Sequence, residues 1–284
     1  MAIDWLDLPA PPALPALFLR AALRRRVTGR SLPELGVRCQ VTVDPKHLAR
    51  YRQICGFADD HRLPAPYPHI LAFALQMQLL TDKRFPFPLL GLVHLENHIR
   101  VLRPLGGLGP FTVSVQVQDL QPHDKGATFS LITQLHDQLG LLWEGDSRIL
   151  CRALRLDGSP AEREAETART QTTLAHWRAP ADIGRRYARI AGDYNPIHMF
   201  AATAKLFGFP RAIAHGLWNK GRALAELAPR LPAAGYAVSV RFQKPVLLPA
   251  EVRLLASEPA SSGQFSLLGA DELQHMSGSW RPLD

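Results

Sequence analysis

The two halves of this 284-residue chain repeat one series of short segments in the same order. The segment at 51–56 reads YRQICG, and the segment at 187–192 reads YARIAG. Further along each half, His69 corresponds to His215, and the sequence FSL occurs at both 129–131 and 265–267. Self-similar segments in a fixed order are typical of a duplicated unit. We therefore expect two copies of one domain, and both halves should adopt the same fold.

Each copy predicts the same order of helices and strands. A short helix comes first, and in the second copy Ile183, Tyr187 and Ile190 share one of its faces by their spacing. A longer helix is expected at about 67–81 in the first copy and 215–228 in the second. Alternating apolar and polar residues at 112–118 and 238–242 then predict strands. This order indicates an α+β fold in which an antiparallel sheet curls around one long helix.

Breaks in composition divide the chain into segments. The turn sequence DGSP at 157–160 is followed by a polar stretch that is poor in large apolar residues. We expect an N-terminal extension at 1–37, a first domain at 38–155, a linker at 156–176 and a second domain at 177–284. The extension contains an amphipathic helix candidate at 16–26, which either packs on the body of the protein or lies at a membrane surface.

The net charge of +8 favours negatively charged partners. Nucleic acid, a phosphate-bearing molecule such as coenzyme A and an acidic carrier protein all fit this charge, and a basic surface also serves solubility. The chain has no zinc-finger spacing, no basic region with heptads and no Arg/Gly-rich tract, so we expect no nucleic-acid partner.

Three widely spaced cysteines without a CxxC pair indicate a reducing compartment and argue against disulfides or structural zinc. The N-terminus lacks a cationic signal-peptide start, and no apolar run has the length of a membrane span. We therefore expect a cytoplasmic protein without a membrane partner. We also expect no cofactor and no metal, and we interpret His94, Glu96 and His98 as surface or interface residues.

The segment at 191–198, AGDYNPIH, places a carboxylate and an imidazole five residues apart across an Asn-Pro break. One interpretation is structural, because Asn195 and Pro196 are favoured residues at the start of a helix. The other is catalytic. Pro196 interrupts any helix between Asp193 and His198, so their side chains can converge on one water as an acid/base pair.

A second cue follows at Gly216, where the long helix of the second copy is expected to begin. Glycine permits close approach of the backbone. A free amide at a helix N-terminus stabilises a developing oxyanion. An acid/base pair with such an amide meets the needs of adding water to an α,β-unsaturated thioester.

The residues at 187–198, the AHG at 214–216 and the segment VRFQKPV at 240–246 resemble the MaoC-like (R)-specific enoyl-CoA hydratases and acyl dehydratases. The clear match covers 178–250, and the internal repeat extends it to a double hot-dog fold. The resemblance implies reversible syn hydration of trans-2-enoyl thioesters to (R)-3-hydroxyacyl thioesters of coenzyme A or acyl carrier protein, in fatty acid metabolism. It also implies that Asp193 and His198 form the catalytic pair and that the backbone of Gly216 binds the thioester carbonyl.

The first copy departs from this pattern. Phe57 stands where the second copy has Asp193, the Asn-Pro-x-His element is missing, and Ile70 replaces Gly216. We therefore expect one working site per chain, with the first copy either making room for an acyl chain or only stabilising its partner.

The candidate substrate-binding residues are Asn195 and His215 beside the pair, and Arg241 and Lys244 for coenzyme A phosphates. Solvated surface charge is the other interpretation of the last two. A non-catalytic acyl-thioester or acyl-carrier-binding module and a hot-dog thioesterase remain as alternative functions. The chain is expected to work as a monomeric pseudo-dimer or as a homodimer.

Overall fold

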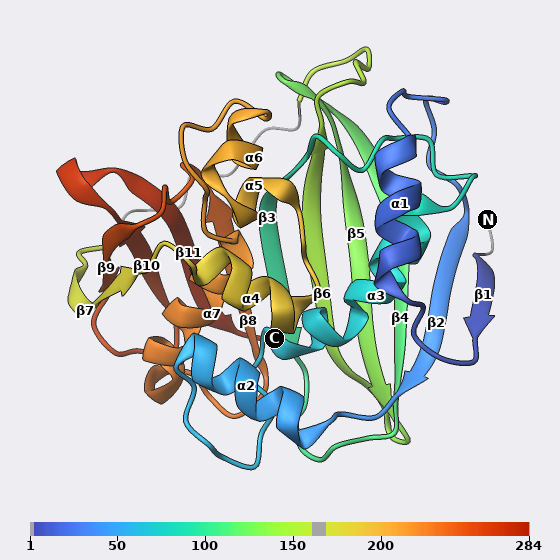
Figure 1. Cartoon of the computed structure of the whole chain (residues 1–284). Coiled ribbons are helices and arrows are strands. Elements are labelled where there is room, and N and C mark those ends of the chain that lie inside the picture. The colour runs from blue at the N-terminus through green and yellow to red at the C-terminus, as the bar shows by residue number, and fades with distance from the viewer. Residues whose placement is uncertain (1–2, 161–168, 284) are drawn as a thin grey trace. The chain divides into compact units, whose positions relative to one another are not determined.

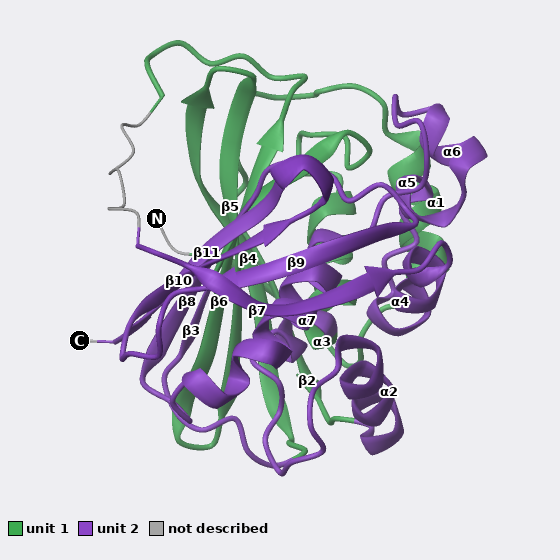
Figure 2. Ribbon diagram, turned by 90° about the vertical axis from the view of Figure 1, so that its left-hand side faces the viewer, with its two compact units in different colours: residues 1–43, 71–98, 108–166 green, residues 44–70, 99–107, 167–284 purple. Residues whose placement is uncertain are grey.

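The computed structural model describes residues 3–160 and 169–283. The chain divides into two compact units, coloured separately in Figure 2. Unit 1 contains residues 1–43, 71–98 and 108–166, and unit 2 contains 44–70, 99–107 and 167–284. Part of the expected linker, 161–168, lies outside the described residues.

Unit 1 is built on an antiparallel sheet with one parallel edge pair. Its strand order is β1-β2-β4-β5-β6-β3, and β1 pairs with β2 in parallel (Figure 1). The strands are β1 (Asp4–Leu8), β2 (Leu35–Val41), β3 (Leu92–Val101, up to residue 98 in this unit), β4 (Phe111–His123), β5 (Gly126–Asp137) and β6 (Gly140–Cys151). The helices are α1 (Leu14–Leu23) and, from residue 71 onward, α3 (Tyr67–Thr81).

The core of unit 1 lies between α3 and the sheet. Gln76 of α3 donates from Nε2 to Thr133 Oγ1 of β5 at 2.9 Å, so even the polar groups at this contact are paired. Phe85, Phe87 and Phe129 form a cluster with ring centroids 5.3–5.8 Å apart. Burying each such side chain stabilises the fold by about 1.5–3 kcal/mol.

Unit 2 contains a sheet with strand order β8-β11-β10-β9-β7 and several helices. The strands are β7 (Thr172–Ala179), β8 (Tyr236–Phe242), β9 (Ala250–Ala256), β10 (Gly263–Leu268) and β11 (Gln274–Pro282). The helices are α2 (Pro45–Cys55), α4 (Ile183–Ala191), α5 (Pro196–Met199), α6 (Ala201–Lys205) and α7 (Gly216–Leu227), with 3₁₀ turns at Ala228–Arg230 and Ala270–Glu272.

The duplication is visible in the strand order. Leaving out β1, unit 1 has the order β2-β4-β5-β6-β3, and unit 2 has the matching order β7-β9-β10-β11-β8. The short helices also correspond, because α2 and α4 end at Gly56 and Gly192 with the same φ of 77°. A left-handed residue at this position favours glycine. The expected long helix at 67–81 is confirmed as α3, and the one expected at 215–228 is α7.

The helix α2 packs within unit 2, although it belongs to the first half of the sequence. Trp218 of α7 donates from Nε1 to the Ile54 carbonyl at 2.9 Å, and Arg222 donates to the Cys55 carbonyl at 2.9 Å. A Cβ at Gly221 would lie 2.9 Å from Cys55 Sγ, so this glycine allows α7 to approach α2 closely. Unit 2 therefore includes residues 44–70 and 99–107 from the first half of the sequence.

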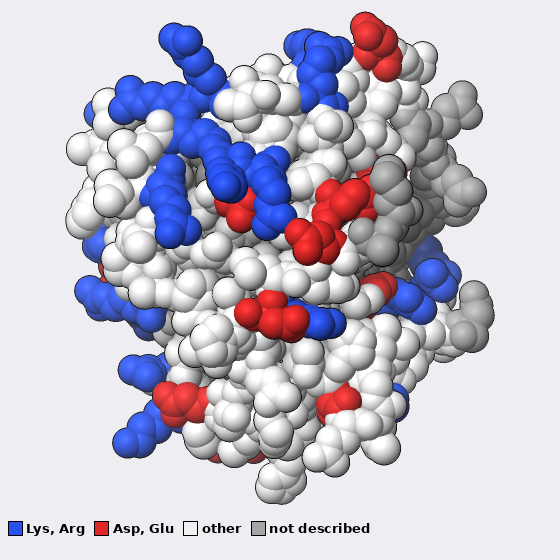
Figure 3. All heavy atoms as spheres, turned by 90° about the vertical axis from the view of Figure 1, so that its right-hand side faces the viewer, with Lys and Arg blue, Asp and Glu red and all other residues white. Residues whose placement is uncertain are grey.

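The N-terminal segment, expected to be an extension outside the two domains, is part of the fold of unit 1. Its residues 4–8 form β1, which adds a strand to the sheet, and Leu17 and Ala21 of α1 are buried. No helix in the described ranges has the length and apolar character needed to cross a membrane. On the face shown in Figure 3, Lys and Arg side chains gather over one area, in keeping with the net positive charge.

Candidate active site

Asp193 lies directly after the end of α4. The left-handed Gly192 closes that helix by donating its N–H to the Ala188 carbonyl at 2.8 Å, and this turn leads the chain into the Asp193 loop. The Asp193 Oδ1 atom accepts from the backbone N–H of Asn195 at 3.1 Å, while about a third of the side chain is exposed. The carboxylate is thus held in place and still open to a small molecule.

His198 lies on α5, the short helix that begins at Pro196. Asn195 caps this helix, because its Oδ1 accepts from the backbone N–H of Ile197 at 3.4 Å. His198 Nδ1 lies 2.8 Å from the Ile213 carbonyl oxygen, which can only accept, so Nδ1 carries the proton. The other nitrogen, Nε2, is therefore the one that can take up a proton in the neutral ring.

A glycine on α4 sets the distance between α4 and α5. A Cβ built on Gly184 would lie 2.1 Å from the backbone oxygen of His198 and 3.4 Å from its Cβ. Every other residue type would push α5 away, so Gly184 is part of the support for His198.

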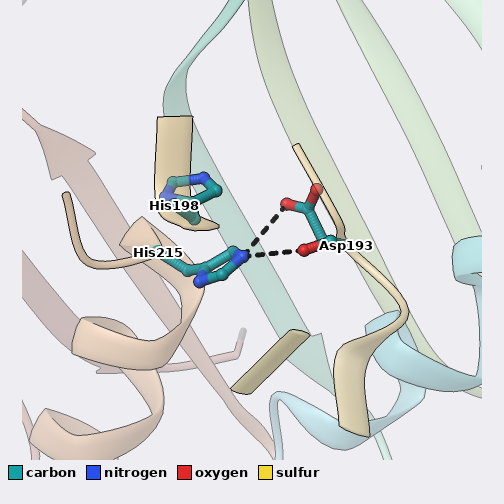
Figure 4. A group of neighbouring side chains, drawn as sticks. All are labelled: Asp193, His198 and His215. Carbon is teal, nitrogen blue, oxygen red and sulfur yellow. Dashed lines mark hydrogen bonds and ion pairs between the residues drawn. The ribbon is translucent and has the colours of Figure 1, made fainter. Parts of the chain in front are cut away.

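His215 joins the pair from the residue that precedes α7. Its Nε2 lies 3.0 Å from the Asp193 backbone oxygen and 3.7 Å from Asp193 Oδ2. The carbonyl only accepts, so Nε2 is the donor. The ring stacks on His198 with centroids 3.6 Å apart and planes 26° apart (Figure 4). His215 thus holds the Asp193 loop through its backbone and packs against the imidazole of His198.

Burial keeps both imidazoles neutral. It lowers the pKa of His198 below the ordinary 6.5, although the nearby Asp193 carboxylate works in the opposite direction. Burial, followed by the neighbouring His198, lowers the pKa of His215 to about 3. At neutral pH the site therefore combines a proton-accepting His198 Nε2 with a His215 that acts as a donor.

The three side chains offer ligand-type atoms within 4.8 Å of one another, which raises the question of a metal. Nearly parallel stacked rings direct their lone pairs along similar lines, whereas metal ligands converge on one point. Nε2 of His215 also donates to a carbonyl. The donor set fits an acid/base pair with a supporting histidine better than a metal centre.

Gly216 is the first residue of α7 and follows His215, which has an extended backbone conformation. The first amides of a helix have no partner within the helix and lie at the positive end of its dipole. A Cβ at Gly216 would lie 3.0 Å from Cδ1 and Cε1 of the Phe242 ring. The Cα of Gly216 therefore packs against the Phe242 ring, with little room for a side chain.

The remaining sequence candidates have different surroundings. The Asn195 side chain serves as the cap of α5, which is the structural interpretation of this residue. Arg241 and Lys244 are exposed and lie outside the Asp193–His198–His215 cluster. Arg241 alternates with Phe242 along β8, so the two side chains leave opposite faces of the sheet, and it is Phe242 that contacts Gly216.

Sequence reasoning missed three supporting groups. The backbone oxygen of Ile213 orients His198. The absence of a side chain at Gly184 allows α5 to pack closely on α4. The centre of the Tyr187 ring lies 5.0 Å from that of the His215 ring. Tyr187 was recognised only as part of the repeat and of a helix face. Its hydroxyl is buried, and burial raises the pKa of Tyr187 well above 10.

The equivalent position of the first copy has no acid. Phe57 follows Gly56, and its ring stacks on Tyr51 with centroids 6.3 Å apart. Asp193 and His198 thus bring a carboxylate and an imidazole together in the second copy, and the Phe57 position of the first copy lacks the carboxylate.

Comparison with known proteins places these observations in a family. Residues 158–264 match the model of the MaoC-like domain. The 3-hydroxyacyl-thioester dehydratase X of Mycobacterium tuberculosis is 36% identical over 221 residues, which cover 77% of this chain and 78% of that protein.

Solved structures agree with this match. The crystal structure of HtdX from Mycobacterium tuberculosis superposes with a TM-score of 0.77 at 32% identity, covering 87% of this chain and 100% of that chain. A Mycobacterium tuberculosis protein described as having a double hotdog fold superposes with a TM-score of 0.56 at 14% identity, covering 93% of this chain and 97% of that chain. The chain belongs to the MaoC-like dehydratase family and has its double hot-dog fold.

Proposed function

We propose that this protein is a hydro-lyase that adds water reversibly to trans-2-enoyl thioesters and forms (R)-3-hydroxyacyl thioesters, in fatty acid metabolism. The observation that carries the proposal is the convergence of the Asp193 carboxylate and the His198 ring beside His215, the residue that precedes α7. The family of the chain and the name of its 36% identical relative support the same reaction class.

In the proposed mechanism, Asp193 and Nε2 of His198 hold one water between them. As the water oxygen adds to Cβ of the enoyl group, His198 Nε2 accepts a proton from it, and negative charge moves to the thioester oxygen. The N–H of Gly216 donates to that oxygen. The Asp193–His198 pair then delivers the proton to Cα from the same side, so the overall reaction is a syn addition and dehydration is its reverse.

The supporting residues keep this pair aligned. The Ile213 carbonyl holds the proton of His198 on Nδ1, which leaves Nε2 basic. His215 donates to the backbone of Asp193 and, in our proposal, positions the loop rather than activating water. Asn195 caps α5, so its loss would act through the orientation of His198.

The test uses purified protein with crotonyl-CoA, following the loss of absorbance of the conjugated double bond. We expect Asp193→Asn and His198→Gln each to lower kcat by about 100- to 10,000-fold, the usual contribution of a positioned acid or base. Circular dichroism and the thermal midpoint confirm that the variants fold. Wild-type rates in either variant would refute the assigned roles.

The same reactions distinguish the alternative functions. Release of free thiol from crotonyl-CoA, measured with a thiol reagent, would indicate a thioesterase. Tight binding without turnover over a series of chain lengths would indicate a non-catalytic binding module.

We further propose that the protein works in the cytoplasm, as one catalytic site per chain. Cys39, Cys55 and Cys151 are all buried free thiols, which supports a reducing compartment. Measuring the molar mass of the protein in solution would show whether the chain works as a monomeric pseudo-dimer or as a homodimer.

A further inference from the structure

A mixed apolar and basic surface lies beside the candidate active site, on the three short helices α4, α5 and α6. We call it the α4–α6 surface. Its exposed apolar side chains are Tyr194, Phe200, Leu206 and Phe207, and its exposed basic side chains are Arg186, Arg189, Lys205 and Arg211. Leu206 is 82% exposed and Phe200 is 53% exposed, and a group of such side chains on one surface is more informative than a single exposed residue.

This surface is ordered by its own contacts. Arg185 of α4 donates to the Met199 carbonyl at 2.9 Å, and its guanidinium lies 4.9 Å from the centre of the Phe200 ring. Thr203 of α6 donates from Oγ1 to the Pro196 carbonyl at 2.6 Å. The helices lie side by side in Figures 1 and 2. The exposed apolar groups therefore belong to a defined surface that includes the helix of His198.

The charge of the same segment is one-sided. Residues 183–217 contain five Lys or Arg residues and one carboxylate, Asp193, which faces His215. Arg186 lies 4.0 Å from Asp182, and both side chains are about half exposed, so this pair neutralises little. In the described part of the chain, Arg189, Lys205 and Arg211 are not among the residues in salt bridges.

We propose that the α4–α6 surface docks an acidic acyl carrier protein, whose pantetheine-linked enoyl chain enters the site at Asp193 and His198. The inference deepens the proposed function and rests on it for the nature of the thioester. A basic rim around apolar anchors suits an acidic protein partner, since the charges steer the encounter and the apolar side chains supply contact area.

Three other occupants fit less well. Free coenzyme A would use the cations through its phosphates but would leave Leu206 and Phe207 in water. A second copy of this chain in a two-fold interface would bring the basic residues of both copies together. An anionic membrane matches the charge, but a membrane surface does not deliver a soluble thioester to His198.

The experiment compares two substrates with the same acyl group, crotonyl-acyl carrier protein and crotonyl-CoA. The variants are Leu206→Glu and Lys205→Glu, and neither residue belongs to the catalytic machinery. The matched controls are Leu139→Glu, at a leucine that is 83% exposed, and Lys125→Glu, both on hairpin turns of unit 1. We expect kcat/KM for the carrier substrate to fall about tenfold in the test variants, and that for crotonyl-CoA to change less than about twofold.

Binding provides a second measurement that does not depend on turnover. Fluorescence anisotropy of labelled crotonyl-acyl carrier protein should show binding that weakens in both test variants and at high salt, and not in the controls. If wild type hydrates neither substrate but this binding pattern holds, the proposed function fails and the docking surface stands.

Four outcomes would overturn the docking proposal. They are equal losses on both substrates, no loss on either, a change from dimer to monomer in Leu206→Glu, and loss of binding to anionic lipid vesicles with carrier activity unchanged.

Discussion

Replacing Gly184 by alanine tests whether the spacing of α4 and α5 controls catalysis. The added Cβ would lie 2.1 Å from the backbone oxygen of His198, whereas an ordinary contact between carbon and oxygen is about 3.3 Å. The contact is with backbone, so no side-chain rotation relieves it. The helix α5 has to move by about 1 Å, and with it the His198 ring and its bond to the Ile213 carbonyl.

A displacement of about 1 Å at a catalytic group lowers rates by about 100-fold. We therefore expect kcat/KM of Gly184→Ala on crotonyl-CoA to fall about 100-fold. Overpacking costs about 1–3 kcal/mol of stability, and the better helix propensity of alanine offsets about 1 kcal/mol of this. The variant should thus remain folded while it loses most of its activity.

The assay is steady-state kinetics together with urea unfolding. Gly106→Ala is the matched control, because a Cβ at Gly106 meets nothing within 4 Å. A Gly184→Ala enzyme with the wild-type rate, or one whose rate falls only as far as its folded fraction, would refute the proposed coupling between α4 and His198.

Three further predictions concern the protonation of His198, the protonation of His215 and the start of α7. Burial lowers the pKa of His198, so kcat/KM should fall to half its plateau value only at a pH below 6.5; a half-maximal value at pH 6.5 or above would contradict a base with a lowered pKa. The pKa of His215 is about 3 in the folded protein and about 6.5 in the unfolded chain, so unfolding takes up protons between these values. The free energy of unfolding should therefore decrease as the pH falls below 6.5, by up to about 1.4 kcal/mol per pH unit, and less in His215→Gln. Gly216→Ala should lower kcat/KM about tenfold, because its Cβ would press on the Phe242 ring, and Phe242→Leu should restore part of the loss. Equal rates in Gly216→Ala and wild type would argue against a role for this backbone.

Some features of the fold were predictable from local sequence. The helix at 67–81 was predicted with the bounds it has, and the strand at 238–242 followed from its alternating residues. The left-handed glycines after α2 and α4 occupy equivalent places in the repeat. Such features depend on neighbours within a few residues, and these are visible in the sequence.

The Asp-x-Asn-Pro-x-His motif predicted that the side chains of Asp193 and His198 lie close together, since its Pro break and its spacing lie within eight residues. Each of its two interpretations has a counterpart in the structure, at different residues. Asn195 caps α5, as the structural interpretation requires, and Asp193 and His198 converge, as the catalytic one requires. From the sequence alone the structural and the catalytic interpretation were alternatives, because the sequence does not show which atoms face the site.

Tertiary structure decided how each group of the candidate site is held. The proton on Nδ1 of His198 is set by a carbonyl fifteen residues away, and the position of His215 depends on a bond to a residue twenty-two positions earlier. The placement of α2 beside α7 in unit 2 depends on contacts that span more than 160 residues. Local periodicity carries no information on such distant pairs, because their approach depends on how the whole core packs. The sequence by itself therefore determined the duplication and the residue types of the candidate site, and packing decided their protonation, their spacing and their support.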